Sequence, residues 1–190
     1  MRLALFGGTF DPIHLAHLAV AREAARRFGL ERVLFVPAAR PPHKAGATHA
    51  SYEDRYRMVE LACTGESGLE ASRLEAGTER SYSIYTIEKV RAGLSPEDEL
   101  FFLIGADAFA EIRTWRRWED VIRAVEFIVV SRPGHEYEAP AGARTRRLET
   151  LELPVSSSEI RRKLALGEAP AEVPEAVLRY IREHGLYRSV

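Results

Sequence analysis

The chain begins with a short apolar run, a pair of glycines and a helical segment, and this order restricts the folds that it can adopt. Residues 3–6 read Leu-Ala-Leu-Phe, which predicts a short buried strand. Residues 18–25 follow a helical pattern. Gly7 and Gly8 lie between the two, and because glycine has no Cβ, backbone here can pass close to a ligand. The start of the helix adds free N–H groups and a positive dipole end, which suit a phosphate.

Two histidines strengthen the phosphate interpretation. His14 and His17 are three residues apart, so a helix places them on one face of its first turn. An isolated histidine pair of this kind is also compatible with ordinary polar residues on a helix surface. Beside a glycine turn and an anion-binding helix start, the pair indicates that the chain handles the phosphate of a nucleotide.

Composition restricts the class of protein to which the chain can belong, but it does not indicate a function. The chain has 190 residues, of which 46% are hydrophobic and 29% charged, and its formal net charge is −1. We expect one globular domain, with no charge excess that calls for nucleic acid or a membrane surface as a partner. Cys63 is the single cysteine, so no disulfide forms within the chain. No apolar run approaches the length of a membrane span and no signal peptide is apparent, and we expect a cytoplasmic protein.

The predicted elements alternate between strands and helices. This order favours an α/β fold, a Rossmann-like, doubly wound and mostly parallel sheet with helices on both faces. We expect a single domain over residues 1–190, with a small C-terminal helical part from about residue 155. The predicted strands are 2–7, 33–36, about 69–74, 100–104, 127–130 and, more weakly, 148–153, and the predicted helices are 15–28, 52–63, 83–92, about 107–112, 117–123, 158–166 and 174–184.

Ligands of such sheets bind where parallel strands end and the strand order reverses. Three segments rich in functional residue types each follow a predicted strand directly, namely 7–17, 105–107 and 154–161. We therefore expect them to contribute to one site.

The segment 155–161 predicts a second helix start that can bind phosphate. Its serines are good N-caps, which by itself explains many such strings. The serine hydroxyls and Arg161 could also bind phosphate oxygens together with the helix N-terminus.

Both segments resemble signatures of the nucleotidyltransferase superfamily. Residues 8–17 fill every position of the pattern G-x-F-x-P-x-H-x-x-H. Residues 155–161 resemble I-S-S-T-x-I-R, with Val155 in place of Ile and Ser158 in place of Thr. Both departures keep the chemical character of the side chain.

The intervening chain resembles the nicotinate mononucleotide adenylyltransferase family. The similarity runs nearly from end to end and depends on five further segments. They are P-P-H-K at 41–44, S-Y-S-I-Y-T at 81–86, G-A-D at 105–107 with Trp115 eight residues after Asp107, R-P-G at 132–134, and the closing helix and tail at 181–187.

The resemblance implies adenylyl transfer from ATP to nicotinate mononucleotide, giving nicotinate adenine dinucleotide and pyrophosphate. Mg²⁺ would arrive with ATP, since magnesium often uses substrate phosphates and water, and the sequence shows no carboxylate cage. The implied catalytic residues are His14, His17, Arg161 and Lys44. The implied ATP-binding residues are Gly7, Gly8, Thr9, Phe10, His14, His17, Gly105, Asp107, Arg132, Ser157, Ser158 and Arg161. The implied pyridine-nucleotide-binding residues are Lys44, Ser83, Thr86 and Trp115.

Several alternatives stay open. Another adenylyltransferase of the superfamily, acting on nicotinamide mononucleotide or pantetheine phosphate, a cytidylyltransferase, and a non-catalytic nucleotide-binding regulator share the signatures. Sequence does not decide between the acid and the amide of the pyridine substrate, although an acid-selective pocket should avoid a nearby carboxylate. A homo-oligomer is possible, and a nucleic-acid-binding role is the weakest alternative.

Overall fold

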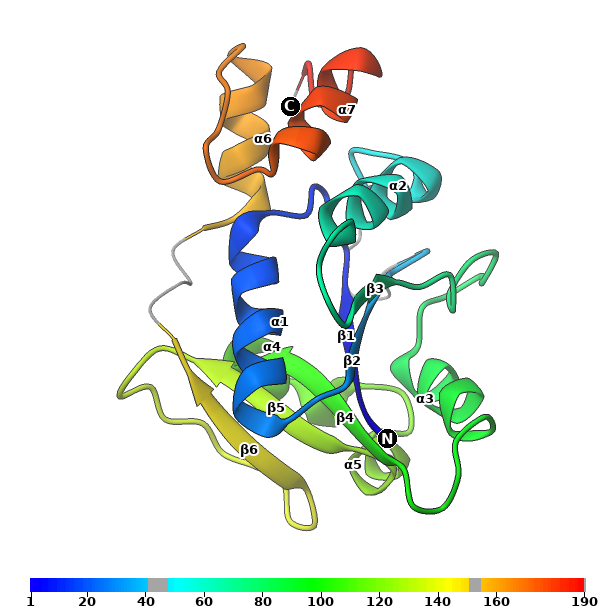
Figure 1. Ribbon diagram of the computed structural model, residues 1–190. Helices are drawn as coiled ribbons and strands as arrows, with labels where there is room; N and C mark the ends of the chain where they lie inside the picture. Colours follow the sequence, from blue (N-terminus) through cyan, green and yellow to red (C-terminus); the bar gives the residue numbers. More distant parts are fainter. Residues whose placement is uncertain (41–47, 151–154, 190) are drawn as a thin grey trace.

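The computed structural model describes residues 1–40, 48–150 and 155–189, and these form a parallel sheet covered by helices on both faces (Figure 1). In the described part of the chain the sheet has six strands in the order β3-β2-β1-β4-β5-β6, and every neighbouring pair is parallel. The strands are β1 (Arg2–Gly8), β2 (Arg32–Pro37), β3 (Leu69–Ala71), β4 (Glu99–Gly105), β5 (Glu126–Ser131) and β6 (Arg144–Glu149). The expected doubly wound α/β fold is confirmed.

The strand order reverses between β1 and β4. The chain moves outward from β1 through β2 to β3, and then returns to the other side of β1 to build β4, β5 and β6. Leu5 in β1 pairs with Leu34 in β2 and with Phe102 in β4. The carboxyl ends of β1 and β4 therefore lie side by side at the point where α/β sheets bind ligands.

Alternating side chains of the strands build two cores, one on each face of the sheet. In β4, Phe101 and Leu103 join one core, and Leu100, Phe102 and Ile104 join the other, as the two-residue period of a strand requires. The first core packs under α1 (Leu15–Phe28), α2 (Tyr52–Cys63), α6 (Ser157–Ala165) and α7 (Glu175–Glu183). The second packs under α3 (Ser83–Arg91), α4 (Ala106–Ala110), the 3₁₀ turn η1 (Ile112–Thr114) and α5 (Trp118–Ala124).

The last strand does not lie where the sequence predicted it. A weak strand was expected at 148–153, whereas β6 spans Arg144–Glu149 and residues 151–153 lie outside the described residues. β6 is an edge strand in which only Leu148 is buried. Because its other side chains are mostly charged, the apolar periodicity that marks an interior strand is missing. The helix expected at 107–112 is also divided, into α4 and η1.

The C-terminal helices α6 and α7 lie beyond the carboxyl ends of the strands, next to α2 and above the amino-terminal end of α1 (Figure 1). Their apolar faces, including Ile160, Val177 and Ile181, are continuous with the first core. The first of these helices begins at Ser157, close to the residue from which we expected a small C-terminal helical part.

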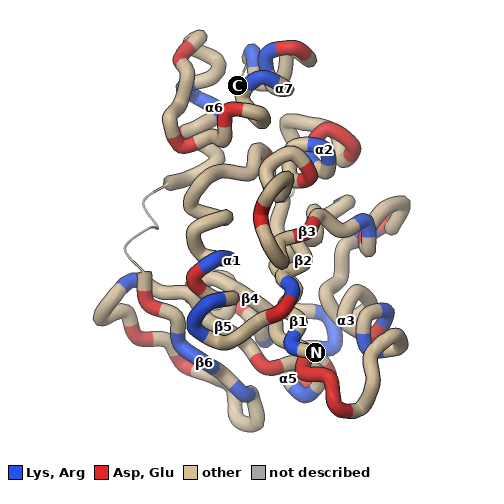
Figure 2. The backbone as a smooth tube through the Cα atoms, in the orientation of Figure 1, with Lys and Arg blue, Asp and Glu red and all other residues tan. Residues whose placement is uncertain are grey.

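Basic and acidic residues are dispersed over the molecule in the view of Figure 2, in keeping with the net charge near zero. Among the described residues, no helix is both long enough and apolar enough to cross a membrane.

The buried side chain of Arg55 connects three backbone segments near the end of β1 by hydrogen bonds. The residue lies in α2 and is fully buried. Its Nη1 donates hydrogen bonds of 2.8 Å to the carbonyls of both Thr9 and Ala38, and its Nε donates to the carbonyl of Ala50 at 3.3 Å. One guanidinium thus satisfies carbonyl groups from three separate segments, which would otherwise be buried without partners.

Replacing Arg55 by Met should lower the free energy of unfolding by about 3–5 kcal/mol. The substitution leaves the buried carbonyls without hydrogen-bond donors and the nearby charge of Asp11 uncompensated. Urea denaturation followed by circular dichroism measures this change. The matched control is Arg57→Met in the same helix, where the guanidinium is exposed and pairs with Glu60. The control should lose no more than about 1 kcal/mol. Equal losses in both variants would contradict the role given to Arg55.

Candidate active site

The loop between β1 and α1 is shaped by close packing around Gly8. A Cβ at Gly8 would lie 3.0 Å from the ring of Phe10, and one at Gly7 would be in ordinary contact with Phe102 at 3.5 Å. A side chain at position 8 would therefore press on the ring of Phe10, which is itself buried. The glycine pair does bring backbone to the carboxyl end of β1, as the sequence indicated.

His14 is the N-cap of α1, and His17 lies one turn further along the same face. The backbone N–H of His14 donates to Nδ1 of His17 at 3.2 Å. This bond makes Nδ1 of His17 an acceptor, so a neutral His17 ring carries its proton on Nε2. The rings of His14 and His17 stack with centroids 3.7 Å apart and planes at 21°.

Both histidines are neutral at physiological pH. Burial lowers the pKa of His14 from 6.5 to about 4, and it lowers the pKa of His17 well below 6.5. Burial disfavours the charged imidazolium because it removes water from the ring. Each ring can therefore donate one N–H hydrogen bond to an anion without carrying a charge of its own.

The second helix start, at α6, meets the same loop. Ser156 caps α6 by accepting a hydrogen bond from the backbone N–H of Glu159, so the helix begins slightly earlier than predicted. The hydroxyl of Ser157 donates to the carbonyl of Pro12 at 3.0 Å. Arg161 donates to the carbonyl of Asp11 at 2.9 Å and to the hydroxyl of Ser158 at 3.1 Å. The expected convergence of the two helix N-termini is thus confirmed by direct contacts between residues far apart in the chain.

A buried carboxylate holds this junction together. Asp11 is 4% exposed, and it accepts hydrogen bonds from the backbone N–H groups of His49 at 2.7 Å and Ala50 at 3.1 Å. The same carboxylate accepts from the hydroxyl of Tyr187, in the C-terminal tail, at 2.5 Å. Burial and the neighbouring Asp11 raise the pKa of Tyr187, so its hydroxyl keeps the proton that it donates. The sequence marks residues 7–17 and 181–187 as separate motifs, and the structure shows that they are in contact.

A cavity of about 320 Å³, the central chamber, opens at the carboxyl ends of β1 and β4. Its walls come from Gly7, Gly8 and Thr9 on one side, and from Ser83 and Trp115 on the other. Trp115 stands edge-on to Phe102, with ring centroids 5.7 Å apart. The structure therefore brings two predicted pyridine-binding residues next to the glycine loop. It leaves Thr86 outside the chamber, in a neighbouring cavity of about 430 Å³.

Two charged residues that sequence analysis did not identify also line the central chamber. They are Glu75, which is buried, and Arg116, which is exposed. Thr86 donates a hydrogen bond of 2.9 Å to Glu75, so this threonine acts on the chamber through the carboxylate. Glu75 lies in an irregular connection without a periodic pattern, and no sequence signal marks it.

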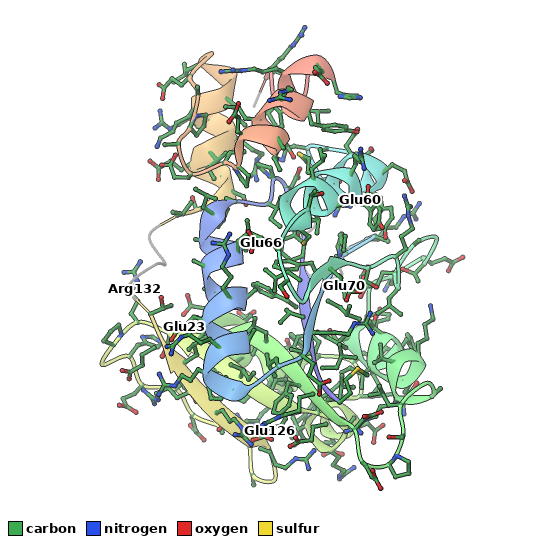
Figure 3. All side chains as sticks on the ribbon, in the orientation of Figure 1. Glu23, Glu60, Glu66, Glu70, Glu126 and Arg132 are labelled. Carbon is green, nitrogen blue, oxygen red and sulfur yellow. The ribbon has the colours of Figure 1, made fainter. Side chains whose placement is uncertain are left out.

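Three other predicted residues lie at a second opening. Gly105, Asp107 and Arg132 line a cavity of about 460 Å³ between the ends of β4 and β5, together with His135. Gly105 also lines the central chamber, so the two openings are adjacent. Figure 3 shows Arg132 extending outward from the loop that follows β5.

Residues 41–47, including Lys44, lie outside the described residues. The role predicted for Lys44 therefore stays a prediction. The segments that flank them are anchored at the site. Ala38 donates its N–H to the carbonyl of Gly8 at 2.8 Å, and Arg40 and Ser81 exchange two hydrogen bonds of 3.1 Å. Within the described ranges, no group of three or more His, Cys, Asp or Glu side chains could hold a metal ion.

Comparison with known proteins agrees with this geometry. The family model for cytidylyltransferase-like proteins matches residues 5–163. A Solibacter usitatus protein named probable nicotinate-nucleotide adenylyltransferase is 68% identical over 187 residues, covering 98% of this chain and 100% of that protein. A Thermus thermophilus protein of the same name is 45% identical over 190 residues, covering 99% and 100%.

Solved structures show the same fold. Plasmodium falciparum nicotinic acid mononucleotide adenylyltransferase complexed with NaAD aligns with a TM-score of 0.80 at 20% identity, over 98% of this chain and 97% of that chain. The same enzyme complexed with APC aligns with a TM-score of 0.78 at 19% identity, over the same shares. Since a family model covers most of the chain and the curated relatives align over nearly its whole length, the chain belongs to the nicotinate-nucleotide adenylyltransferase family of cytidylyltransferase-like proteins.

Proposed function

We propose that the protein transfers the adenylyl group of ATP to nicotinate mononucleotide and releases pyrophosphate. The observation that carries this proposal is the junction at residues 11–14, where the N-terminus of α6 meets that of α1 beside the central chamber. The names of the curated relatives support the same reaction.

The transfer needs little covalent help from the protein. A phosphate oxygen of the mononucleotide attacks the α-phosphorus of ATP, the bond from this phosphorus to the bridging oxygen breaks, and pyrophosphate leaves with Mg²⁺. The nucleophile is already anionic, so catalysis consists of alignment and stabilisation of charge. Mg²⁺ would be held by the phosphates of ATP, because magnesium often binds through substrate phosphates and water.

In this proposal, His17 donates its Nε2–H to the α-phosphate, where negative charge grows in the transition state. His14 stacks on His17 and holds the phosphates beside it. The N–H groups of Gly8, Thr9 and Phe10 complete the cradle, because the loop follows a strand and precedes a helix start.

Arg161 and the serines at the start of α6 hold the β- and γ-phosphates. Two facts support this role. Nε of Arg161 is buried without a hydrogen-bond partner among the described residues, and its Nη1 and Nη2 are fixed by Asp11 and Ser158. The guanidinium is therefore positioned at the loop while its Nε–H donor stays unused, and guanidinium donors bind phosphate oxygens well.

The central chamber takes the pyridine ring. Trp115 offers an aromatic surface there, and the start of α3 at Ser83 presents helix N–H groups to a ring carboxylate. We assign the adenosine to the cavity between β4 and β5, with Asp107 accepting a ribose hydroxyl and Arg132 on the same side. Lys44 is proposed to offset repulsion between the two anionic substrates, from outside the described residues.

A cytoplasmic location is part of the proposal, because a single, buried and unpaired cysteine fits a reducing compartment. Nicotinamide mononucleotide is the second candidate acceptor. It is favoured by one observation, the carboxylate of Glu75 at the central chamber, where a carboxylate was not expected for an acid-selective pocket.

Purified protein with Mg²⁺ and ATP should form a dinucleotide and pyrophosphate from nicotinate mononucleotide. The same assay with nicotinamide mononucleotide, with pantetheine phosphate, and with CTP in place of ATP separates the alternatives. Failure to release pyrophosphate with any acceptor would favour a non-catalytic nucleotide-binding protein.

His17→Ala should lower kcat about 10²- to 10³-fold and change the Kd for ATP little, because the lost hydrogen bond is strongest in the transition state. Steady-state kinetics and ATP titration measure the two effects. The control is His184→Ala, which removes an exposed ring near the C-terminus. A variant of His17 with near-normal turnover would refute its role.

Trp115→Ala should raise KM for the mononucleotide about fivefold, the loss expected for one aromatic stacking contact of about 1 kcal/mol. KM for ATP should change less, because the adenosine is assigned to the cavity between β4 and β5 and the phosphates to the junction of α1 and α6. Trp118→Ala removes a ring that is outside the chamber and serves as the matched control. Equal effects of Trp115→Ala on both KM values would indicate that this ring only packs the core.

The depressed pKa of His14 should make stability depend on pH. The ring is neutral in the folded state down to about pH 4, whereas the unfolded chain takes up a proton near pH 6.5. Its contribution is present in full above pH 6.5 and is lost as the pH falls toward 4. Urea titrations should show that His14→Gln removes about 3 kcal/mol of the wild-type decrease between these pH values. An unchanged pH dependence would mean that the folded ring titrates normally.

A further inference from the structure

The central chamber holds one charged side chain of each sign among its described lining residues. Glu75 supplies a carboxylate and Arg116 a guanidinium. The two pyridine mononucleotides have nearly the same shape and differ in the ring substituent, which is a carboxylate in one and a carboxamide in the other. Charge and hydrogen-bond donors therefore have to distinguish them, since size cannot.

Glu75 presents a buried acceptor with spare capacity. Its side chain is 8% exposed. Oε1 accepts the hydrogen bond of 2.9 Å from Thr86, a residue that is also buried. Oε2 is buried and has no hydrogen-bond partner among the described residues. A buried polar atom without a partner is unusual in a native fold, and it is explained when a ligand supplies the missing donor.

Arg116 is held at the edge of the chamber by aromatic residues of the α3 start. Its guanidinium carbon lies 5.2 Å from the ring centre of Tyr82, which also lines the chamber. Its Nε donates to the hydroxyl of Tyr85 at 3.0 Å. Contacts with Tyr82 and Tyr85 therefore fix the position of this cation. Arg116 directly follows Trp115 in the sequence.

We propose that Arg116 and Glu75 set the choice between a ring carboxylate and a ring carboxamide, and that they act in opposite directions. Arg116 attracts the carboxylate by its charge and binds the neutral amide more weakly. Glu75 repels the carboxylate and accepts a hydrogen bond from the amide nitrogen. The preference of the enzyme is the balance of the two, and this inference depends on the proposed function.

The test is the ratio of kcat/KM for nicotinate mononucleotide to kcat/KM for nicotinamide mononucleotide, measured with saturating MgATP. Arg116→Gln should lower this ratio about fivefold, and Arg116→Lys should keep it within about twofold of the wild type, because the charge is retained. Glu75→Gln should raise the ratio about fivefold. Gln still accepts the hydrogen bond from Thr86, so this variant preserves the local fold.

Two matched controls remove the same charges at the neighbouring cavity. Arg80 and Glu79 line that cavity and not the central chamber. Arg80→Gln and Glu79→Gln should leave the ratio unchanged. Because one active site turns over both substrates, a partly unfolded preparation alters both kcat/KM values equally and does not move the ratio.

Opposite shifts for Arg116→Gln and Glu75→Gln, with unchanged controls, would support the proposal. Shifts in the same direction, or an unchanged ratio for either variant, would overturn it even when the wild type is active. A wild-type protein that makes no dinucleotide from either mononucleotide would instead show that the proposed function itself is wrong, and the inference with it.

Discussion

The buried carboxylate of Asp11 is the interaction on which the site depends. It belongs to the loop after β1, and it binds the backbone at residues 49–50 and the tail hydroxyl of Tyr187. The carbonyl of the same residue accepts the hydrogen bond from Arg161. A carboxylate taken out of water is costly unless it is fully hydrogen-bonded. Each partner must therefore be in place for the loop to keep this conformation, and the relative position of α1 and α6 follows from that requirement.

Arg55 supplies the complementary charge on the other side of the loop. Burial lowers the pKa of its guanidinium and the charge of Asp11 opposes this effect, so the two buried ions support each other. Buried ions of this kind add little net stability compared with apolar residues of the same size. Their advantage here is directional: apolar packing could cover the end of β1, but it could not fix the carbonyls of Thr9 and Ala38 in one arrangement. We regard the pair as a device that specifies loop geometry.

Sequence patterns predicted the parts of this protein that follow local rules. The interior strands β1, β4 and β5 are apolar runs, and the topological rule for parallel sheets assigned residues 7–17 and 154–161 to one site. The prediction was wrong at β6 because the side chains of that edge strand are mostly charged. Glu75 and Arg116 could not be predicted, because they line the same cavity only when the connection after β3 folds back on the turn after η1. No periodicity records a contact between two irregular segments, and a buried glutamate looks like a surface residue in a sequence.

The protonation states explain why the site uses two kinds of donor. His14 and His17 are neutral, so they add hydrogen bonds and no charge. The positive potential at the junction comes from Arg161 and from the two helix N-termini. A guanidinium does not titrate in the physiological range, and the helix dipole does not titrate at all. In the proposed function, the charge that the protein offers to a triphosphate is therefore constant with pH, whereas the imidazoles provide direction. In the proposed reaction, a neutral imidazole stabilises the α-phosphate through the direction of its N–H bond, at the group where negative charge grows in the transition state.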